Sequence, residues 1–269
     1  MPRKAPSNIT AWSFSRWNTY EQCPRKAKYQ IIDRMPIEQN DAMRRGSIIH
    51  ILAEMYVKNN LSSLPRRLAT DRQLGGKVPK EFEHYLTGDF DPDELPEELR
   101  LFDDEFFELQ ELMNDGVLTI QSEEQWAFNR NWTPCDWFGK AAWLRTVVDL
   151  MVYNEKEQRV TIIDYKTGKI RDGYDEQLKL YVASAFAKFP QAEEVRTELW
   201  YLDQGEIKGG DDDDGTDAGL CTQEDGDKFT KYWTDKVKPM LVDQRFAPKP
   251  SHLCRWCDFS HAKGGPCEY

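Results

Sequence analysis

The chain has 269 residues, of which 39% are hydrophobic and 12% aromatic, and its formal net charge is −11. This length fits one large domain or one core with a substantial insertion, and the apolar and aromatic content argues against a disordered chain. No apolar run approaches the roughly 18 residues of a membrane span, and the first ten residues hold no apolar signal region, so we expect a cytoplasmic protein outside membranes.

The first predicted helix covers residues 13–23. A serine caps its start, and Pro24 ends it at Cys23, because proline disfavours the helical conformation in the residue before it. Basic residues follow this helix directly. Cys23 alone is typical of a small buried residue, so its meaning depends on the other cysteines of the chain.

A second helix is predicted between residues 41 and 58, where apolar residues recur at helical spacing. Gly46 lies four residues before His50 in this helix, and the glycine leaves room for a ligand or a neighbouring backbone beside the histidine. A lone histidine on a helix is more often structural. His50 is therefore a candidate only in combination with other residues.

An insertion at about 60–116 follows. Its first part, 60–92, contains several prolines and glycines with little periodicity and predicts irregular structure. Residues 94–115 predict a strongly acidic amphipathic helix, whose charged side chains are best interpreted as a solvated face.

Three strands are predicted next, at 117–128, 138–153 and 159–164. Asp149 lies among core-type residues of the middle strand, where a carboxylate is costly unless it is paired or bound to a cation. A turn between the second and third strands predicts a β-hairpin that brings Asp149 and Asp164 to one site.

The third strand ends in Asp164-Tyr165-Lys166. Side chains alternate along a strand, so Asp164 and Lys166 point to the same side and can serve as a metal ligand and a cation beside a scissile phosphate. The alternative is an ordinary surface salt bridge. A turn then leads into a predicted helix in which Gln177 and Tyr181 share one face.

The remaining chain predicts a strand at 195–202, a mobile acidic loop at 203–221 and a helix from about 225 to 244. The loop contains Asp211–Asp214, but it lacks the ligand spacing of a calcium-binding EF-hand loop. The acids are concentrated in this region and in residues 81–124, so the rest of the chain is net positive. A phosphate-rich partner is therefore compatible with the overall negative charge.

The C-terminal segment carries a cysteine pattern typical of a metal site. Cys254 and Cys257 have the C-x-x-C spacing, and Cys267 follows among glycines and a proline. Cys23 is the natural fourth ligand, whereas His252 or His261 in that role would indicate zinc. Cys135 and Cys221 receive no role.

Taken together, the motifs resemble the RecB-like branch of the PD-(D/E)xK nuclease superfamily, most closely its iron-sulfur exonucleases. These include CRISPR-associated adaptation nucleases and their phage-encoded relatives. The resemblance covers nearly the whole chain and rests on six ordered pieces: SFSRWNTYEQCPRKAKY with Cys23, Arg45-Gly46-Ser47-Ile48-Ile49-His50, Asp149, Asp164-Tyr165-Lys166-Thr167-Gly168, Gln177 with Tyr181, and the three C-terminal cysteines.

The resemblance implies an α/β fold with a restriction-endonuclease-like mixed sheet flanked by helices. It implies Mg²⁺ or Mn²⁺ held by His50, Asp149, Asp164 and the backbone carbonyl of Tyr165. Lys166 would then position or activate the attacking water, while Gln177 and Tyr181 orient Lys166 and the DNA. It also implies a 4Fe-4S cluster, with zinc as the alternative, whose ligands are Cys23, Cys254, Cys257 and Cys267.

The implied function is a divalent-metal-dependent deoxyribonuclease, most closely an exonuclease acting on DNA ends or single strands. A non-catalytic module that binds DNA ends or a protein partner is the alternative. The expected segments are 1–45 with the first cluster cysteine, a nuclease core at 46–202, the acidic loop at 203–227, and a C-terminal helix with the cysteine clasp at 228–269.

Two positions depart from the family pattern. Relatives often have glycine where this chain has Thr146, and many have glutamate where this chain has Asp164. The first affects the strand geometry, and the second shortens the reach to a metal ion by one methylene.

Overall fold

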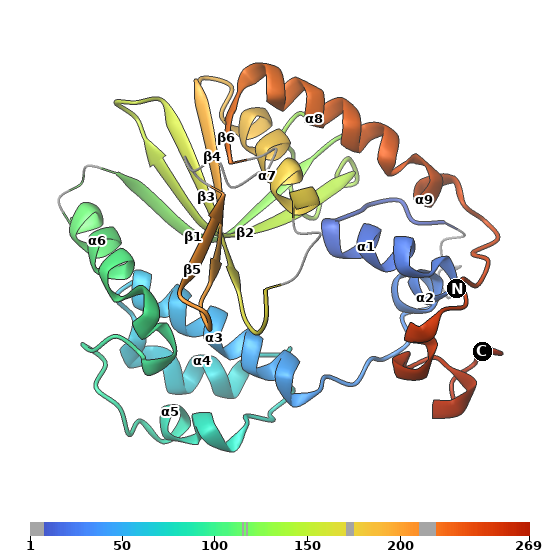
Figure 1. Ribbon diagram of the computed structural model, residues 1–269, viewed down its shortest axis with the longest axis horizontal. Helices are drawn as coiled ribbons and strands as arrows, with labels where there is room; N and C mark the ends of the chain where they lie inside the picture. The colour runs from blue at the N-terminus through green and yellow to red at the C-terminus, as the bar shows by residue number, and fades with distance from the viewer. Residues whose placement is uncertain (1–7, 115, 117, 171–174, 210–218) are drawn as a thin grey trace. The chain divides into compact units, whose positions relative to one another are not determined.

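A computed structural model describes residues 8–114, 116, 118–170, 175–209 and 219–269 of the chain (Figure 1). By proximity the chain divides into two compact units, each built from separate segments. Unit 1 comprises Met1–Glu38, Trp126–Thr146 and Thr230–Tyr269, and unit 2 comprises Gln39–Gln125 and Val147–Phe229. The domain boundaries expected from the sequence stay predictions.

The central feature is a six-stranded sheet that is mostly antiparallel. Its main path runs β1-β2-β3-β4-β5, and β6 pairs with the first residues of β4, before the part that pairs with β5. The pair β3 and β4 is parallel, whereas β2–β3, β4–β5 and β4–β6 are antiparallel. The strands are β1 Thr119–Phe128, β2 Leu144–Asn154, β3 Arg159–Lys166, β4 Glu194–Tyr201, β5 Glu206–Gly209 and β6 Leu220–Thr222.

Helices flank this sheet, so the expected mixed α/β architecture is confirmed and is consistent with a restriction-endonuclease-like fold. The α-helices are α1 Phe14–Gln22, α2 Pro24–Ala27, α3 Asp41–Val57, α4 Leu64–Thr70, α5 Glu83–Thr87, α6 Asp103–Asn114, α7 Asp175–Lys188, α8 Gln223–Lys236 and α9 Lys238–Val242. The short helices are η1 Lys28–Ile32, η2 Leu61–Ser63, η3 Lys80–Phe82, η4 Glu97–Phe102, η5 His252–Trp256 and η6 His261–Lys263. None of the described helices combines the length and the apolar composition needed to cross a bilayer.

Strands β2 and β3 form the β-hairpin expected from the sequence, and in it Leu150 lies opposite Ile163 and Asn154 opposite Arg159. From β3 the chain passes through α7 and returns as β4, parallel to β3. A parallel pair needs such a crossover, because a tight turn can only reverse the chain direction.

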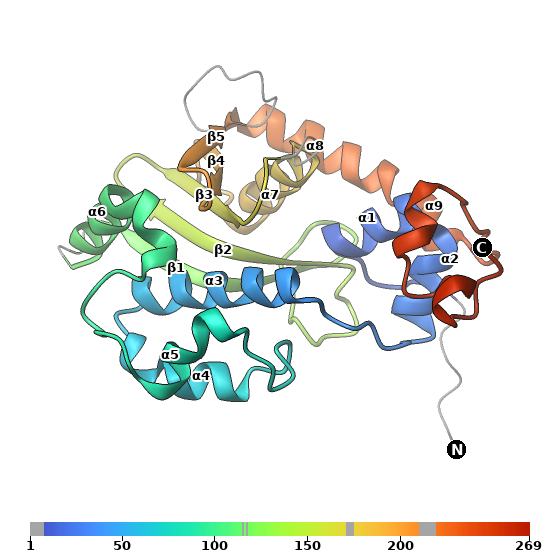
Figure 2. The ribbon, with the colours of Figure 1, turned by 60° about the horizontal axis from the view of Figure 1, so that its bottom comes forward.

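Two helices of unit 2 lie on opposite faces of the sheet. Figures 1 and 2 show α3 on one side and α7 on the other. On the α3 side, Phe106 of α6 packs against Tyr165 and Trp200, with ring centroids 5.9 and 5.6 Å apart. These rings belong to one hydrophobic core with the buried face of α3. The close packing of this core fixes the ends of β3 and β4 relative to α3.

Unit 1 has its own aromatic core. The ring of Trp233 stacks on Trp12 at 5.5 Å and meets Trp17 edge-on at 4.9 Å, and Trp143 contacts Trp12 edge-on at 5.4 Å. Three distant segments supply these rings. Burial of such large side chains is the main favourable contribution to the stability of this unit.

The insertion differs from its expected irregular structure. Residues 61–87 contain two α-helices and two short 3-10 helices, and Leu61, Leu64, Leu68 and Phe82 are buried in the unit 2 core. Each of these helices has seven residues or fewer, so none is long enough to show a clear helical period.

The acidic stretch after β4 also differs in part. Its ends form β5 and β6, and α8 begins at Gln223, whereas Asp211–Asp214 lie outside the described residues. The single helix expected from about 225 to 244 is two helices, α8 and α9, with Val237 between them and Pro239 in the first turn of α9.

Candidate active site

The end of β3 places an acid and an amine in direct contact. Asp164 Oδ2 forms an ion pair with Lys166 Nζ, and both side chains are largely buried, with 5% and 13% of their surface exposed. Their contact follows from strand geometry, because residues two apart point to the same side. Burial sets this pair apart from a surface salt bridge.

Helix α7 brings an amide and a phenol to the same pair. Gln177 Nε2 donates to Asp164 Oδ1 at 2.8 Å, while Gln177 Oε1 accepts from Lys166 Nζ at 2.9 Å. Tyr181, one turn later, donates its hydroxyl to Asp164 Oδ1 at 2.6 Å. The amide therefore contacts both charged groups at once and fixes their relative position.

Asp149 of β2 meets His50 of α3. Asp149 Oδ2 lies 3.3 Å from His50 Nδ1 and accepts a hydrogen bond from the backbone N–H of Tyr165 at 2.8 Å. This bond fixes the backbone of Tyr165 beside the site. The ligand role expected for the Tyr165 carbonyl stays a prediction.

A second set of contacts fixes the first turns of α3 near the turn after β3. Arg45 donates two hydrogen bonds to Asp203, of 2.8 and 2.6 Å, and Asp203 also accepts from the backbone N–H of Gly168. A Cβ on Gly46 would lie 3.0 Å from Thr167 Oγ1, so the glycine permits a close approach. Helix α3 therefore carries His50 at a defined distance from the strand end.

Glu123 of β1 also belongs to this site, and the sequence analysis missed it. One ligand atom from each of His50, Glu123 and Asp149 can be chosen so that all lie within 4.8 Å of one another. Glu123 falls within an acid-rich part of the sequence. Nothing in its spacing distinguishes it from Glu124.

The charges perturb one another strongly. Burial acts to lower the pKa of His50, but the charge of Asp149, the hydrogen bond to it and the charges of Asp164 and Glu123 raise that pKa to about 9. Burial and the Asp149 charge raise the pKa of Glu123 to about 7. This is the electrostatic pattern of a functional site.

The two aspartates shift in opposite directions. Burial raises the pKa of Asp164, with the Asp149 charge adding to it and Lys166 opposing it. Burial also acts to raise the pKa of Asp149, but the charge of His50 and hydrogen bonds from His50 and Tyr165 bring it below its ordinary value. Different partners thus shift the pKa values of these two neighbouring acids in opposite directions.

The donor atoms fit a divalent cation that prefers oxygen. Carboxylate oxygens suit Mg²⁺ and Mn²⁺, and one imidazole shifts the preference toward Mn²⁺. Asp149, Glu123 and His50 supply such a set from three elements of unit 2. Asp164 lies next to them, at the Lys166 amine.

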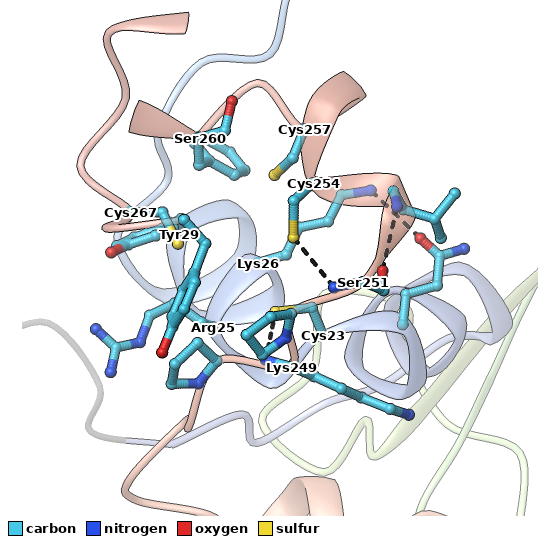
Figure 3. A pocket seen from close by; sticks show the side chains of 16 residues that line it. Cys23, Arg25, Lys26, Tyr29, Lys249, Ser251, Cys254, Cys257, Ser260 and Cys267 are labelled. Atoms are coloured by element: carbon cyan, nitrogen blue, oxygen red, sulfur yellow. Dashed lines mark hydrogen bonds between the residues drawn. The ribbon is translucent and has the colours of Figure 1, made fainter. Parts of the chain in front are cut away.

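The four cysteines predicted as cluster ligands come together in unit 1. Cys23, Cys254, Cys257 and Cys267 all line one cavity of about 50 Å³, and Figure 3 shows their sulfurs around a common space. None of them is in a disulfide. The backbone N–H groups of Lys249 and Ser251 donate to Cys23 Sγ and Cys254 Sγ, both at 3.4 Å.

The model of the PD-(D/E)XK nuclease superfamily matches residues 11–262. The chain therefore belongs to this superfamily, whose members are nucleases that act with divalent metal ions. No curated protein matches the chain. A solved structure, that of SSO0001, is similar over 83% of this chain and 97% of its own, with 14% identity and a TM-score of 0.30. That score is too low to establish a shared fold.

Proposed function

We propose that this protein is a divalent-metal-dependent deoxyribonuclease of the iron-sulfur exonuclease type, acting on DNA ends or single strands. The observation that carries the proposal is the convergence of His50, Asp149, Asp164 and Lys166 in one site of unit 2. Membership of a nuclease superfamily supports the same chemistry.

Each residue of the site has a proposed role that follows from its chemical type. His50, Asp149 and Asp164 would hold Mg²⁺ or Mn²⁺, which stabilises the charge that develops on the phosphoryl oxygens and lowers the pKa of the attacking water. Lys166 places a positive charge beside the scissile phosphate. Gln177 holds the Lys166 amine through its Oε1 atom, so the amine keeps its direction when the DNA binds.

Cleavage of end-labelled DNA tests this function. Single- and double-stranded DNA labelled at the 5′ or the 3′ end should be degraded in Mn²⁺, and Asp149→Asn, Asp164→Asn and Lys166→Ala should each abolish degradation without loss of fold. Lys156→Ala, at an exposed lysine in the β2–β3 turn, is the matched control and should cleave normally. DNA binding without product in every divalent ion would instead identify a non-catalytic binding module.

The cysteine site is proposed to hold a 4Fe-4S cluster. Four thiols around one cavity, with backbone N–H groups directed at two of the sulfurs, form the environment that such clusters require. Anaerobically purified protein should be brown and contain iron. Colourless protein with one zinc per chain would favour a zinc site at the same cysteines.

A further inference from the structure

Glu123 lies on β1, the strand next to the one that carries Asp149. Its carboxylate is half-buried and within 4.8 Å of a donor atom on both His50 and Asp149. The three side chains come from α3, β1 and β2. Three potential ligand atoms this close together can bind a single cation.

The backbone at Glu123 is unusual. Its φ is 56°, in the left-handed region that non-glycine residues rarely adopt, and it lies inside a strand. A left-handed residue in a strand is characteristic of a bulge, which redirects a side chain and is frequent next to active sites. Such a conformation costs on the order of 1 kcal/mol or more, so the rest of the structure must hold it in place.

The charges around Glu123 are incompletely balanced. Asp149 is paired with His50 and Asp164 with Lys166. Among the described residues, no ion pair joins Glu123 to a lysine or arginine; the charges of Asp149 and Glu54 act to raise its pKa, and those of His50 and Lys58 oppose them. Two carboxylates held this close repel each other unless a cation lies between them.

We infer that Glu123 is a ligand of the divalent cation, together with His50 and Asp149. This inference rests on the proposed function and adds a third carboxylate to the donor set formed by His50, Asp149 and Asp164. A third carboxylate ligand from the protein suits Mn²⁺ or Mg²⁺, which prefer hard oxygen donors. It also gives the strained conformation of Glu123 a chemical reason.

Mn²⁺ binding without DNA tests the inference independently of nuclease activity. The full chain, freed of divalent ions, is titrated with Mn²⁺ by calorimetry or by the electron paramagnetic resonance signal of the free ion. Glu123→Gln should bind Mn²⁺ at least about tenfold more weakly than the unaltered protein. Glu124→Gln changes the neighbouring half-buried glutamate and should bind as the unaltered protein does.

Thermal unfolding provides a second readout. Removing the Glu123 charge relieves its repulsion with Asp149, so Glu123→Gln in EDTA should unfold at the same temperature as the unaltered protein or higher. Added Mn²⁺ should raise its Tm by less than it raises that of the unaltered protein, because a ligand stabilises the folded state in proportion to its affinity. A clear loss of Tm in EDTA would assign Glu123 a structural role and overturn the inference.

The remaining outcomes separate this inference from the proposed function. If Glu123→Gln binds Mn²⁺ normally while Asp149→Asn does not, the metal site stands and Glu123 is not a ligand. If Glu124→Gln weakens Mn²⁺ binding to the same extent, the loss of any negative charge on β1 explains the effect and the inference fails. Absence of Mn²⁺ binding by the unaltered protein would overturn the nuclease proposal as well.

Discussion

Three side chains donate to the carboxylate of Asp164. Gln177 and Tyr181 donate to one oxygen, and Lys166 pairs with the other. Each of these side chains is itself held by a packed strand or helix. The orientation of Asp164 is therefore set before any ligand binds, which is the preorganisation that catalysis needs.

Tyr181→Phe tests the contribution of one of these donors. The change removes the 2.6 Å hydrogen bond to Asp164 and keeps the buried ring. We expect a rate of DNA cleavage about tenfold lower, with little change in Tm, because the lost contact orients Asp164, a proposed metal ligand. Tyr153→Phe is the control, since the contacts of the Tyr153 hydroxyl with Gln158 and Gln191 are long, at 3.4 and 3.5 Å. Equal rates in both variants would contradict the orienting role.

The sequence predicted the contacts in this site that follow from the periodicity of a single strand or helix. Asp164 and Lys166 touch because strand side chains alternate, and Gln177 and Tyr181 meet because they lie one helical turn apart. Glu123 could not be found in this way. Its place depends on a left-handed residue within a strand, which no pattern of apolar and polar residues encodes.

At the scale of elements, the ion pair between Arg45 and Asp203 links α3 to the residues that follow β4. It is bidentate, so it fixes an angle as well as a distance. Asp203 also accepts from Gly168 in the turn after β3. One carboxylate thus joins the start of the helix bearing His50 to the turn beyond Lys166.

This tie predicts a pH dependence of stability. Burial acts to raise the pKa of Asp203, but hydrogen bonds from Arg45 and Gly168 lower it beneath its ordinary 3.8. A carboxyl with a lowered folded-state pKa stabilises the fold above its ordinary pKa, and this contribution is lost as the pH falls through the lowered value. Asp203→Asn should therefore be less stable than the unaltered protein at neutral pH.

The difference in unfolding free energy should shrink below about pH 4, when measured by urea denaturation over a pH series. Asp89→Asn, at an exposed acid of the insertion, serves as the control and should show no such trend. A difference for Asp203→Asn that stays constant down to pH 2 would show that its charge is not responsible.

The C-terminal clasp depends on a glycine for its close packing. A Cβ on Gly265 would lie 2.3 Å from the carbonyl carbon of Phe259, and Cys267 N–H donates to the same carbonyl oxygen at 2.9 Å. Backbone atoms cannot rotate away as a flexible side chain can. The turn that brings Cys267 into the cavity therefore requires glycine at this position.

Gly265→Ala should accordingly displace Cys267, lower the iron content expected for the proposed 4Fe-4S cluster and cost about 1–3 kcal/mol of stability. The readouts are iron analysis, the visible absorbance and Tm. Gly264→Asn is the matched control, because Gly264 has φ of 75° with open space around its Cβ position, and asparagine tolerates this conformation. Full iron loading in Gly265→Ala would show that the clasp accommodates the extra methyl group.

The main elements of the fold were predictable where they are long and regular. The strands β2, β3 and β4 and the helices α3 and α7 show strong apolar periods, and the structure confirms them. The insertion was misjudged because its helices are short and separated by prolines and glycines. Leu64 and Leu68 are completely buried, but two leucines four positions apart do not by themselves identify a helix.

For the molecule as a whole, the two proposed sites belong to different units. Every residue proposed to bind the divalent cation lies in unit 2, and all four cysteines lie in unit 1. Each site is also built from segments far apart in sequence. Binding at either site therefore ties together distant parts of the chain within its own unit.

Hydrogen exchange tests this separation. Mn²⁺ should slow amide exchange in peptides that contain His50, Asp149 or Asp164 and leave residues 252–269 unchanged, because the ion stabilises only the segments that bind it. Asp149→Asn should lose the protection. Equal protection of residues 252–269 would show instead that Mn²⁺ binds at the cysteines.

The assembly of unit 1 from three separated segments has a consequence for synthesis on the ribosome. Cys23 and the helix before it are translated early, but the residues that complete their cavity are translated last. The last residue of unit 2, Phe229, is made before the last segment of unit 1, so Trp12 and Trp17 lack their partner Trp233 until late in synthesis. Any group that all four cysteines hold together can consequently be bound only after the C-terminal segment has been made.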